Sequence, residues 1–270
     1  MEYCAVVNSH ESYHDALKIF LKCFRQKTDN IPLYVCTNTK DGIELTDNEI
    51  LVEYSGKTFS EQGLYSLKNI PFQYILTFND DYFVTDTPAY SEIDRCIEVL
   101  KMSNFSQIRF VRGPNFSAFS GFDRLFKLDN SKPFFFSQTL SLWKRDDLIQ
   151  VYENTPKSGI ARKGNEEQFE VLANRTCARL GLEGLVYYND EPKEGYFHYE
   201  CSIMPHLISA IVDGKWNMSE YKIKLEEIFE EFAISTDRTK GPSNKNVQRL
   251  FLYLNSLPQV KNAINKRLKR

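Results

Sequence analysis

Short apolar runs alternate with longer amphipathic segments in the N-terminal part of the chain. Segment 14–24 places apolar residues three and four positions apart, from Leu17 to Phe24, which predicts a helix with one apolar face. Helices are expected in the same way after Ser60, a residue suited to cap one, and at 90–101. The runs between them are rich in β-branched and aromatic residues, which is typical of buried strands: 3–7, 32–37, 50–54, 73–78 and 107–111. This alternation predicts an α/β fold with a central, mostly parallel mixed sheet.

The second half of the chain has a less regular pattern. The mixture of Gly, Ser, Asn and Phe at 114–130 indicates an irregular loop, and the apolar run at 134–142 predicts a sixth strand. A helix is expected at 166–180, and further helical segments from Ser219 onward. We therefore expect one α/β domain over residues 1–217 and a helical C-terminal extension over residues 218–270.

Composition narrows the class of protein. Hydrophobic residues make up 42% of the chain and aromatic residues 14%, which is too apolar for a disordered chain and sufficient for a large core. The net charge of −2 argues against a broad basic face, so no nucleic-acid partner is expected. The six cysteines form no CxxC pair, which favours reduced core thiols over a zinc site or a disulfide framework. No run is apolar and long enough to span a membrane, and no secretory signal is recognised, so a cytoplasmic location is expected.

Two adjacent acidic residues, Asp80 and Asp81, follow the strand expected at 73–78. In open α/β sheets ligands bind beyond the carboxyl ends of strands, and a hard divalent cation takes carboxylate ligands together with substrate phosphates. Aspartate is also common in solvated turns, which is the alternative interpretation of a bare pair. Because this pair follows an apolar strand and precedes Tyr82 and Phe83, it predicts a site for Mn²⁺ or Mg²⁺ on a diphosphate.

The segment around this pair resembles a known family. Residues 74–83, YILTFNDDYF, are similar to the YILLLxDDFF segment of bacterial and viral GT-A glycosyltransferases that build capsule, lipopolysaccharide or surface glycans. Residues 9–15 resemble the family's S-x-x-S-Y-x-D entry, and residues 60–67 its WSD..LL.AL helix start. Later segments resemble its fSlQpsLW and closing rGKW motifs, at 136–143 and 213–217. The resemblance implies the GT-A fold and transfer of a sugar from a nucleotide sugar.

One departure from the family lies beside the acidic pair. The family often has an acidic residue directly before the two aspartates, and here this position is Asn79. An amide oxygen can still bind a cation, but the metal site then carries less negative charge.

The resemblance and the chemistry of individual side chains together give candidate site residues. Asp81 and Asp80 are expected to hold the metal ion, with His198 as the additional histidine ligand that GT-A enzymes often have. An arginine offers a fork that fits phosphate, and a lysine offers a point charge for it. The candidate contacts to the donor are Ser9, His10, Ser60, Glu61, Asp80, Arg109, Gln138 and Lys215.

A transferase that inverts the anomeric centre also needs a base that deprotonates the acceptor hydroxyl. The start of the helix expected at 166–180 carries Glu166, Glu167 and Glu170. Resemblance to a common ED motif favours Glu167, and resemblance to a PWEFE segment favours Glu170, with Gln168 in place of the first glutamate. Glutamate is favoured in any first helical turn by the macrodipole, so all three stay open as candidates.

These observations predict a metal-dependent glycosyltransferase that moves a sugar, in the first place from a UDP-sugar, to a glycan or lipid-linked acceptor. One alternative is a nucleotidyltransferase, but residues 7–15 lack the Gly-rich basic loop that holds a triphosphate. Another is a noncatalytic glycan- or partner-binding module, which Asn79 and Gln168 favour. Basic residues gather at 261–270, which predicts either peripheral contact with the inner face of a membrane or a solvated terminus.

Overall fold

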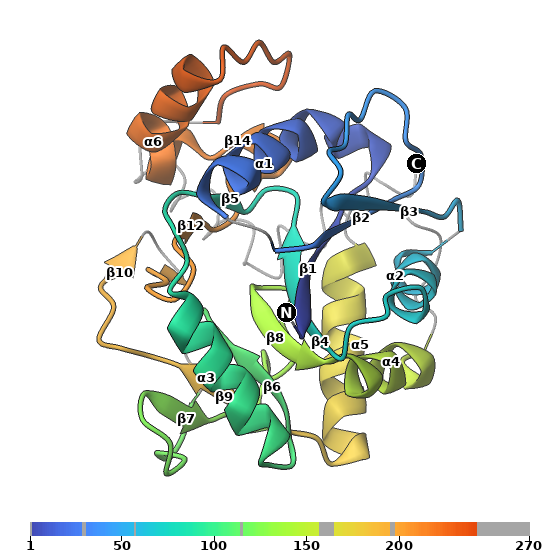
Figure 1. The fold of residues 1–270 in the computed structure, drawn as a ribbon, viewed down its shortest axis with the longest axis vertical. Coiled ribbons are helices and arrows are strands. Elements are labelled where there is room, and N and C mark those ends of the chain that lie inside the picture. The colour runs from blue at the N-terminus through green and yellow to red at the C-terminus, as the bar shows by residue number, and fades with distance from the viewer. Residues whose placement is uncertain are drawn as a thin grey trace, which may run out of the picture. The chain divides into compact units, whose positions relative to one another are not determined.

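The computed structural model describes residues 2–28, 31–56, 58–113, 116–156, 165–194 and 198–241, leaving aside the side chains of 165–168 and 198. Its centre is an eight-stranded sheet in the order β3-β2-β1-β4-β8-β6-β9-β7 (Figure 1). The strands are β1 (Tyr3–Asn8), β2 (Leu33–Thr37), β3 (Glu49–Glu53), β4 (Tyr74–Asn79), β6 (Phe105–Arg109), β7 (Leu125–Lys127), β8 (Ser141–Lys144) and β9 (Glu183–Tyr187).

Most strands of the sheet run in one direction. Strands β3, β2, β1 and β4 pair in parallel, and β9 is parallel to β6. Strand β8 lies antiparallel between β4 and β6, and β7 is antiparallel to β9 at the edge. The predicted α/β class with a mostly parallel mixed sheet is therefore confirmed.

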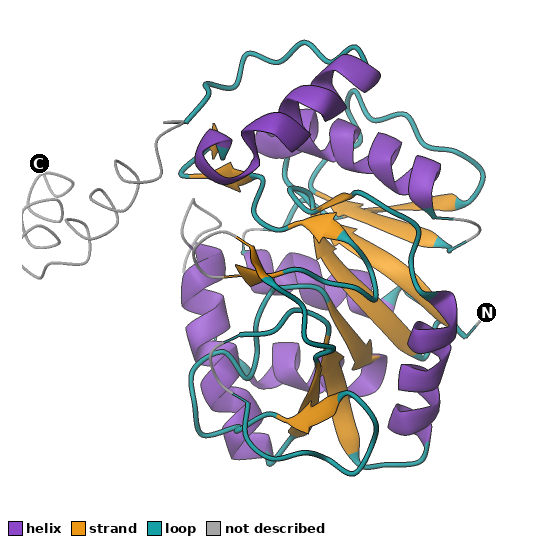
Figure 2. Ribbon diagram, turned by 90° about the vertical axis from the view of Figure 1, so that its left-hand side faces the viewer, coloured by secondary structure: helices purple, strands orange, loops and turns teal. Residues whose placement is uncertain are grey.

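Helices cover both faces of the sheet (Figure 2). On one face, α2 (Phe59–Lys68), α4 (Arg145–Asn154) and α5 (Asn165–Leu180) contact one another. On the other face lie α1 (His14–Lys27) and α3 (Tyr90–Lys101). The rings of Phe20 and Phe24 on α1 pack 5.6 and 5.9 Å from the ring of Phe78, which points away from the α2 side of β4. Both faces are buried, which explains why the strand runs are apolar without alternation.

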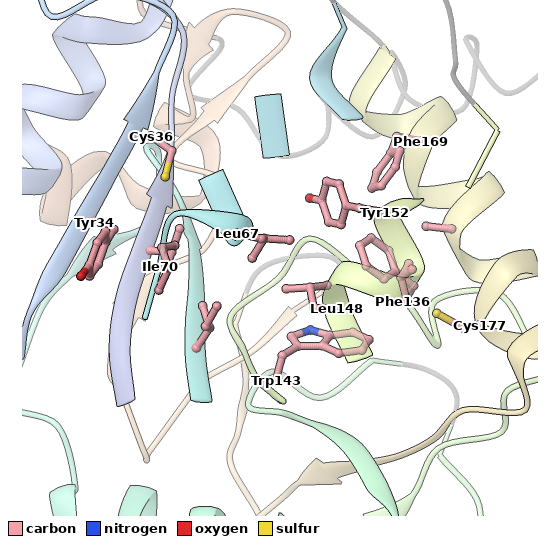
Figure 3. Close-up of a cluster of buried hydrophobic side chains, with 14 of the residues drawn as sticks. Tyr34, Cys36, Leu67, Ile70, Phe136, Trp143, Leu148, Tyr152, Phe169 and Cys177 are labelled. Carbon is pink, nitrogen blue, oxygen red and sulfur yellow. The ribbon is translucent and has the colours of Figure 1, made fainter. Parts of the chain in front are cut away.

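An aromatic core fills the face under α2, α4 and α5 (Figure 3). The ring centroid of Phe169 on α5 lies 4.6 Å from that of Tyr152, 5.8 Å from that of Phe136 and 5.4 Å from that of Phe59. Phe169 is fully buried. Burial of a side chain of this size stabilises the fold by about 1.5–3 kcal/mol. The packing therefore fixes the start of α5 against the loop that precedes β8.

Short strand pairs and one short helix complete the first unit. Strand β5 (Phe83–Val84) pairs antiparallel with β12 (His206–Leu207), and β10 (Lys193–Glu194) with β11 (His198–Tyr199). A 3₁₀ helix, η1 (Glu11–Tyr13), leads from β1 into α1. The β5–β12 pairing brings residues 206–207 next to β5, which directly follows the Asp80-Asp81 turn.

The chain divides into two compact units, residues 1–208 and 209–270. In its described part the second unit contains β13 (Ile211–Val212), β14 (Lys215–Trp216) and α6 (Met218–Glu231). The buried ring of Trp216 lies 5.1 Å from that of Phe229. The predicted division at residue 217 stays a prediction, and the basic segment 261–270 lies outside the described residues. None of the helices in the described ranges combines the length and the apolar character needed to cross a bilayer.

The strand expected at 134–142 is wrong over most of its length. Strand β8 covers only Ser141–Lys144, and Phe134 has a positive φ of 67° that no strand residue adopts. Side chains rather than a strand ladder pair with the backbone here: Gln107 Nε2 donates to the Phe135 carbonyl, and Asn174 Oδ1 accepts from the Phe136 amide. The apolar run reflects burial of Phe135 and Phe136 as an irregular segment against the sheet.

The cap of α2 also differs from the prediction. Helix α2 begins at Phe59, and the side chain of Thr58, not Ser60, accepts a hydrogen bond from the Glu61 amide at 3.2 Å. Ser60 is instead the second residue of the helix, with its hydroxyl 3.2 Å from that of Thr58. A side-chain hydroxyl on a residue with an extended backbone is suited to the cap position.

Replacing Thr58 with alanine is expected to destabilise the fold by about 1 kcal/mol, because one amide of the first helical turn loses its acceptor. The free energy of unfolding in urea measures the change. Ser60→Ala is the matched control, and it should leave the cap bond intact. An equal or larger loss in Ser60→Ala would contradict this assignment of the cap.

Candidate functional site

The carboxyl ends of β1, β2, β4, β6 and β9 meet at one edge of the sheet, because these strands run in the same direction. Strand β8 runs the opposite way, so the loop that precedes it reaches the same edge. This edge is where ligands bind in open α/β sheets. Most candidate residues predicted from the sequence are on segments that end or begin here.

A buried hydrogen bond joins the ends of β1 and β4. Asn8 and Asn79 are partners in the parallel register, and the next residue on each strand is Ser9 and Asp80. Ser9 Oγ donates to Asp80 Oδ2 at 2.6 Å, and both residues are buried. A short charge-assisted bond of this kind fixes the orientation of the carboxylate. The sequence placed both residues among the donor contacts, and the structure brings them together.

The acidic pair lies in a tight turn. The Tyr82 amide donates to the Asn79 carbonyl at 3.1 Å, so Asp80 and Asp81 occupy the middle of the turn. Asp81 is partly exposed, whereas Asp80 is buried. Thus Asp80 is held inward by Ser9, and Asp81 is the carboxylate with the greater access to solvent.

The described residues contain no ready-made group of three or more histidine, cysteine, aspartate or glutamate side chains for a metal ion. Two adjacent carboxylates nevertheless suit Mg²⁺ or Mn²⁺, which complete their shells with water and substrate phosphates. The side chain of His198, the predicted histidine ligand, lies outside the described residues.

His206 is a histidine beside this turn whose place the sequence did not reveal. Strand β12 sets its backbone opposite Val84, and its ring lies 5.4 Å from that of Tyr82. Its Nδ1 lies 2.7 Å from the Met204 carbonyl oxygen, which can only accept, so Nδ1 carries a proton. The pairing of two-residue strands leaves no periodic signal in the sequence, which is why this proximity was missed.

A small pocket opens beside the ends of β1 and β4. Its volume is about 30 Å³, enough for one or two water molecules. The lining combines aromatic side chains with a few polar groups from several elements: Asn8, Phe59, Thr77, Phe78, Asn79, Phe136, Ser137, Gln138, Trp143, Leu148 and Tyr152. Gln138 Nε2 is buried without a hydrogen-bond partner among the described residues. A buried amide of this kind is costly unless a ligand or water accepts from it.

Arg109, Gln138 and Glu170 converge at the same edge from three separate elements. Arg109 is 2% exposed at the end of β6, and its guanidinium donates to the Phe134 carbonyl. Burial lowers the pKa of Arg109 to about 10, an effect that the negative charge of Glu170 opposes, so the guanidinium stays protonated at neutral pH. The backbone N–H of Gln138 donates a long hydrogen bond of 3.5 Å to Glu170 Oε2. The sequence proposed all three residues separately, and the fold brings them together.

The other candidates lie in different settings. His10 is exposed and its Nδ1 accepts from the Ser12 amide, while Ser60 and Glu61 are at the start of α2. Helix α2 reaches the first strand through Gln62, whose Nε2 lies 3.4 Å from the Ser9 carbonyl. Lys215 is exposed on β14 in the second unit, and the side chains of Glu166 and Glu167 lie outside the described residues.

Neither a protein-family model nor the sequence of a curated protein matches the chain. Among solved structures, it is similar to S. aureus TarS 1–349, with 11% identity, a TM-score of 0.45 and coverage of 74% of this chain and 60% of that one. The complex of TarS 1–349 with UDP-GlcNAc matches with 10% identity, a TM-score of 0.45 and coverage of 87% and 67%. A CMP:2-keto-3-deoxy-manno-octonic acid synthetase complexed with CTP matches with 8% identity, a TM-score of 0.44 and coverage of 86% and 99%.

These similarities are to nucleotide- and nucleotide-sugar-binding enzymes of mixed α/β fold. The chain spans 60% of the TarS 1–349 chain and 36% of a longer TarS chain. Several TarS chains are among the matches, one of them in complex with UDP. Since TM-scores are below 0.5 and a synthetase stands beside TarS, the comparisons assign neither reaction nor substrate to this chain.

Proposed function

We propose that this protein is a metal-dependent glycosyltransferase that moves a sugar from a nucleotide sugar, in the first place a UDP-sugar, to a glycan or lipid-linked acceptor. The single observation that carries the proposal is the Ser9–Asp80 bond, which fixes the carboxylate of Asp80, directly before Asp81, at the strand ends beside a pocket lined by aromatic side chains and a few polar groups. Carboxylates positioned in this way suit a cation bound to a diphosphate.

Asp81 and Asp80 would hold Mn²⁺ or Mg²⁺, with water and the diphosphate completing the coordination shell and His198 as the predicted histidine ligand. When bound, such an ion neutralises the charge that develops on the departing diphosphate. Ser9 keeps Asp80 oriented through its 2.6 Å hydrogen bond. Gln138, whose buried Nε2 in the pocket wall has no partner among the described residues, is proposed to donate to a hydroxyl of the transferred sugar.

Glu170 is the base that we favour for the acceptor hydroxyl. Its carboxylate faces the loop of Gln138, and the positive charge of Arg109 lies near it. The buried rings around Phe169 fix this turn of α5, so the carboxylate is held on a rigid element. Glu166 and Glu167 remain candidates for the same role.

The experiment that tests the function is hydrolysis of nucleotide sugars by the full chain without acceptor. A panel of UDP-, GDP- and CMP-linked sugars is incubated with Mn²⁺ or with EDTA. We expect slow release of nucleotide from one donor, lost in EDTA and restored by excess Mn²⁺. Turnover unaffected by EDTA would contradict the metal role.

Two other results would overturn the proposal. Release of pyrophosphate from a nucleoside triphosphate and a sugar phosphate would identify a nucleotidyltransferase. No turnover, together with no thermal stabilisation by any nucleoside diphosphate plus Mn²⁺, would indicate a noncatalytic binding module, because a ligand of the folded state raises its melting temperature.

A further inference from the structure

Arg112 is a cation surrounded by aromatic rings at the carboxyl edge of the sheet. Its guanidinium carbon lies 4.7 Å from the ring centroid of Phe116, 4.3 Å from that of Tyr188 and 4.4 Å from that of Tyr199. These distances are within the range of cation–π attraction. Three rings from three separate segments thus hold the guanidinium in one place.

The charge of Arg112 has no carboxylate partner within ion-pair distance in the described part of the chain. Other arginines differ in this respect: Arg25 bonds Glu49 and Arg95 bonds Glu92, each at 2.7 Å. The Nε atom of Arg112 is buried and makes no hydrogen bond to a described residue. A partly buried cation without a counter-charge is a binding element for an anion, since aromatic faces do not neutralise it.

The rings around Arg112 belong to a larger aromatic cluster, which consists of Phe116, Phe119, Phe126, Tyr188 and Tyr199. Successive rings lie 5.1 to 6.3 Å apart, from Phe119 through Phe126 and Phe116 to Tyr188 and Tyr199. Phe119 is 58% exposed, and Phe116, Tyr188 and Tyr199 are partly exposed. The cluster is therefore accessible to a ligand and is not a closed core.

The position of this cluster relates it to the proposed donor site. Arg112 comes three residues after the end of β6, and Tyr188 directly follows β9. In the sheet order, β6 lies two strands from β4 and β9 lies three strands from it. At about 4.8 Å per strand, the segments that follow β6 and β9 start about 10–14 Å from the acidic pair along the same edge. That separation is close to the length of two sugar rings.

We infer that the acceptor is an acidic saccharide, whose sugar rings contact the aromatic cluster and whose negative group binds the guanidinium of Arg112. This inference rests on the proposed function and adds the chemical class of the acceptor. A planar fork with fixed rings around it suits a carboxylate or a phosphate equally well. The shared chemistry is therefore an anionic group attached to a sugar chain, from a uronic acid or from a phosphate ester.

The test measures binding of oligosaccharides to the full chain without donor or metal. The probes are oligogalacturonate and its methyl ester, which differ only in charge, and maltotetraose with and without a phosphate ester. We expect one acidic probe to bind about tenfold or more tightly than its neutral counterpart, as one charge-assisted contact allows. The acidic probe that binds distinguishes carboxylate from phosphate.

Two variants and one control separate the roles. Arg112→Gln should remove the preference for the acidic probe and leave binding of the neutral probe unchanged. Phe119→Ser, at an exposed ring, should weaken acidic and neutral probes alike. Arg175→Gln removes an exposed arginine of α5 and should change neither.

The outcomes decide the inference independently of the proposed function. Equal binding of charged and neutral probes, an acidic preference that persists in Arg112→Gln, or no binding of any probe would each overturn it. A lower melting temperature in Arg112→Gln without a change in preference would indicate a purely structural role. Donor hydrolysis by the wild type is measured separately, and its absence would contradict the proposed function and not this binding result.

Discussion

Replacing Asp81 with asparagine is expected to reduce sugar transfer about a thousandfold or more while leaving the fold intact. Asparagine has nearly the same shape but no charge, so the site loses half of its acidic pair and the cation on the diphosphate loses its more accessible carboxylate. Charge stabilisation of a departing group is among the largest contributions to catalysis. The measurements are kcat/KM for donor hydrolysis and for transfer, with the melting temperature recorded in parallel.

A suitable control for this substitution is Asp86→Asn. Asp86 is an exposed aspartate shortly after β5, and its Oδ1 accepts from the neighbouring Thr87 amide. It should retain wild-type turnover. Undiminished turnover in Asp81→Asn, or a loss fully rescued by raising the donor concentration alone, would refute the metal role of Asp81.

Replacing Glu170 with glutamine is expected to lower kcat for transfer about a hundredfold to ten-thousandfold, the range of a lost general base. The KM for the donor should change little, because Glu170 is proposed to act on the acceptor hydroxyl. Glutamine keeps the shape of the side chain, and its side-chain oxygen can still accept from the backbone N–H of Gln138. The measurement is the rate of transfer at saturating donor and acceptor.

Glu183→Gln serves as the comparison, since Glu183 is exposed at the start of β9. Glu167→Gln should have the smaller effect of the two α5 variants, and the reverse order would make Glu167 the base. A product that retains the anomeric configuration of the donor, as read by NMR, would remove the need for a base and contradict the assignment to either glutamate.

The sequence predicted the parts of the fold that depend on local pattern. The strands β1, β2 and β4 and the helix α3 come at the expected places because each has a continuous apolar run or a clear helical spacing. The position of Asp80 at a strand end followed from the same pattern. Such features need no knowledge of which strands pair.

Features that depend on pairing between distant segments were not predictable in this way. His206 lies beside the acidic turn only because a two-residue strand pairs with β5. The convergence of Arg109 and Glu170 depends on the position of α5 over the sheet. The irregular segment at 134–140 looked like a strand because buried phenylalanines give the same apolar pattern in either conformation, and only its backbone partners distinguish the two.

The reversed strand β8 has a consequence for how the chain acquires its structure. Strand β8 pairs with β4, with Lys144 opposite Tyr74. The central part of the sheet therefore forms only after the long stretch of chain between these two strands has been ordered. Contacts so far apart in sequence slow folding. During synthesis, β1 and β4 can pair before β8 emerges, which leaves the apolar Tyr74–Asn79 strand as an exposed edge that favours aggregation. We therefore expect truncations that end before Ser141 to accumulate as insoluble protein.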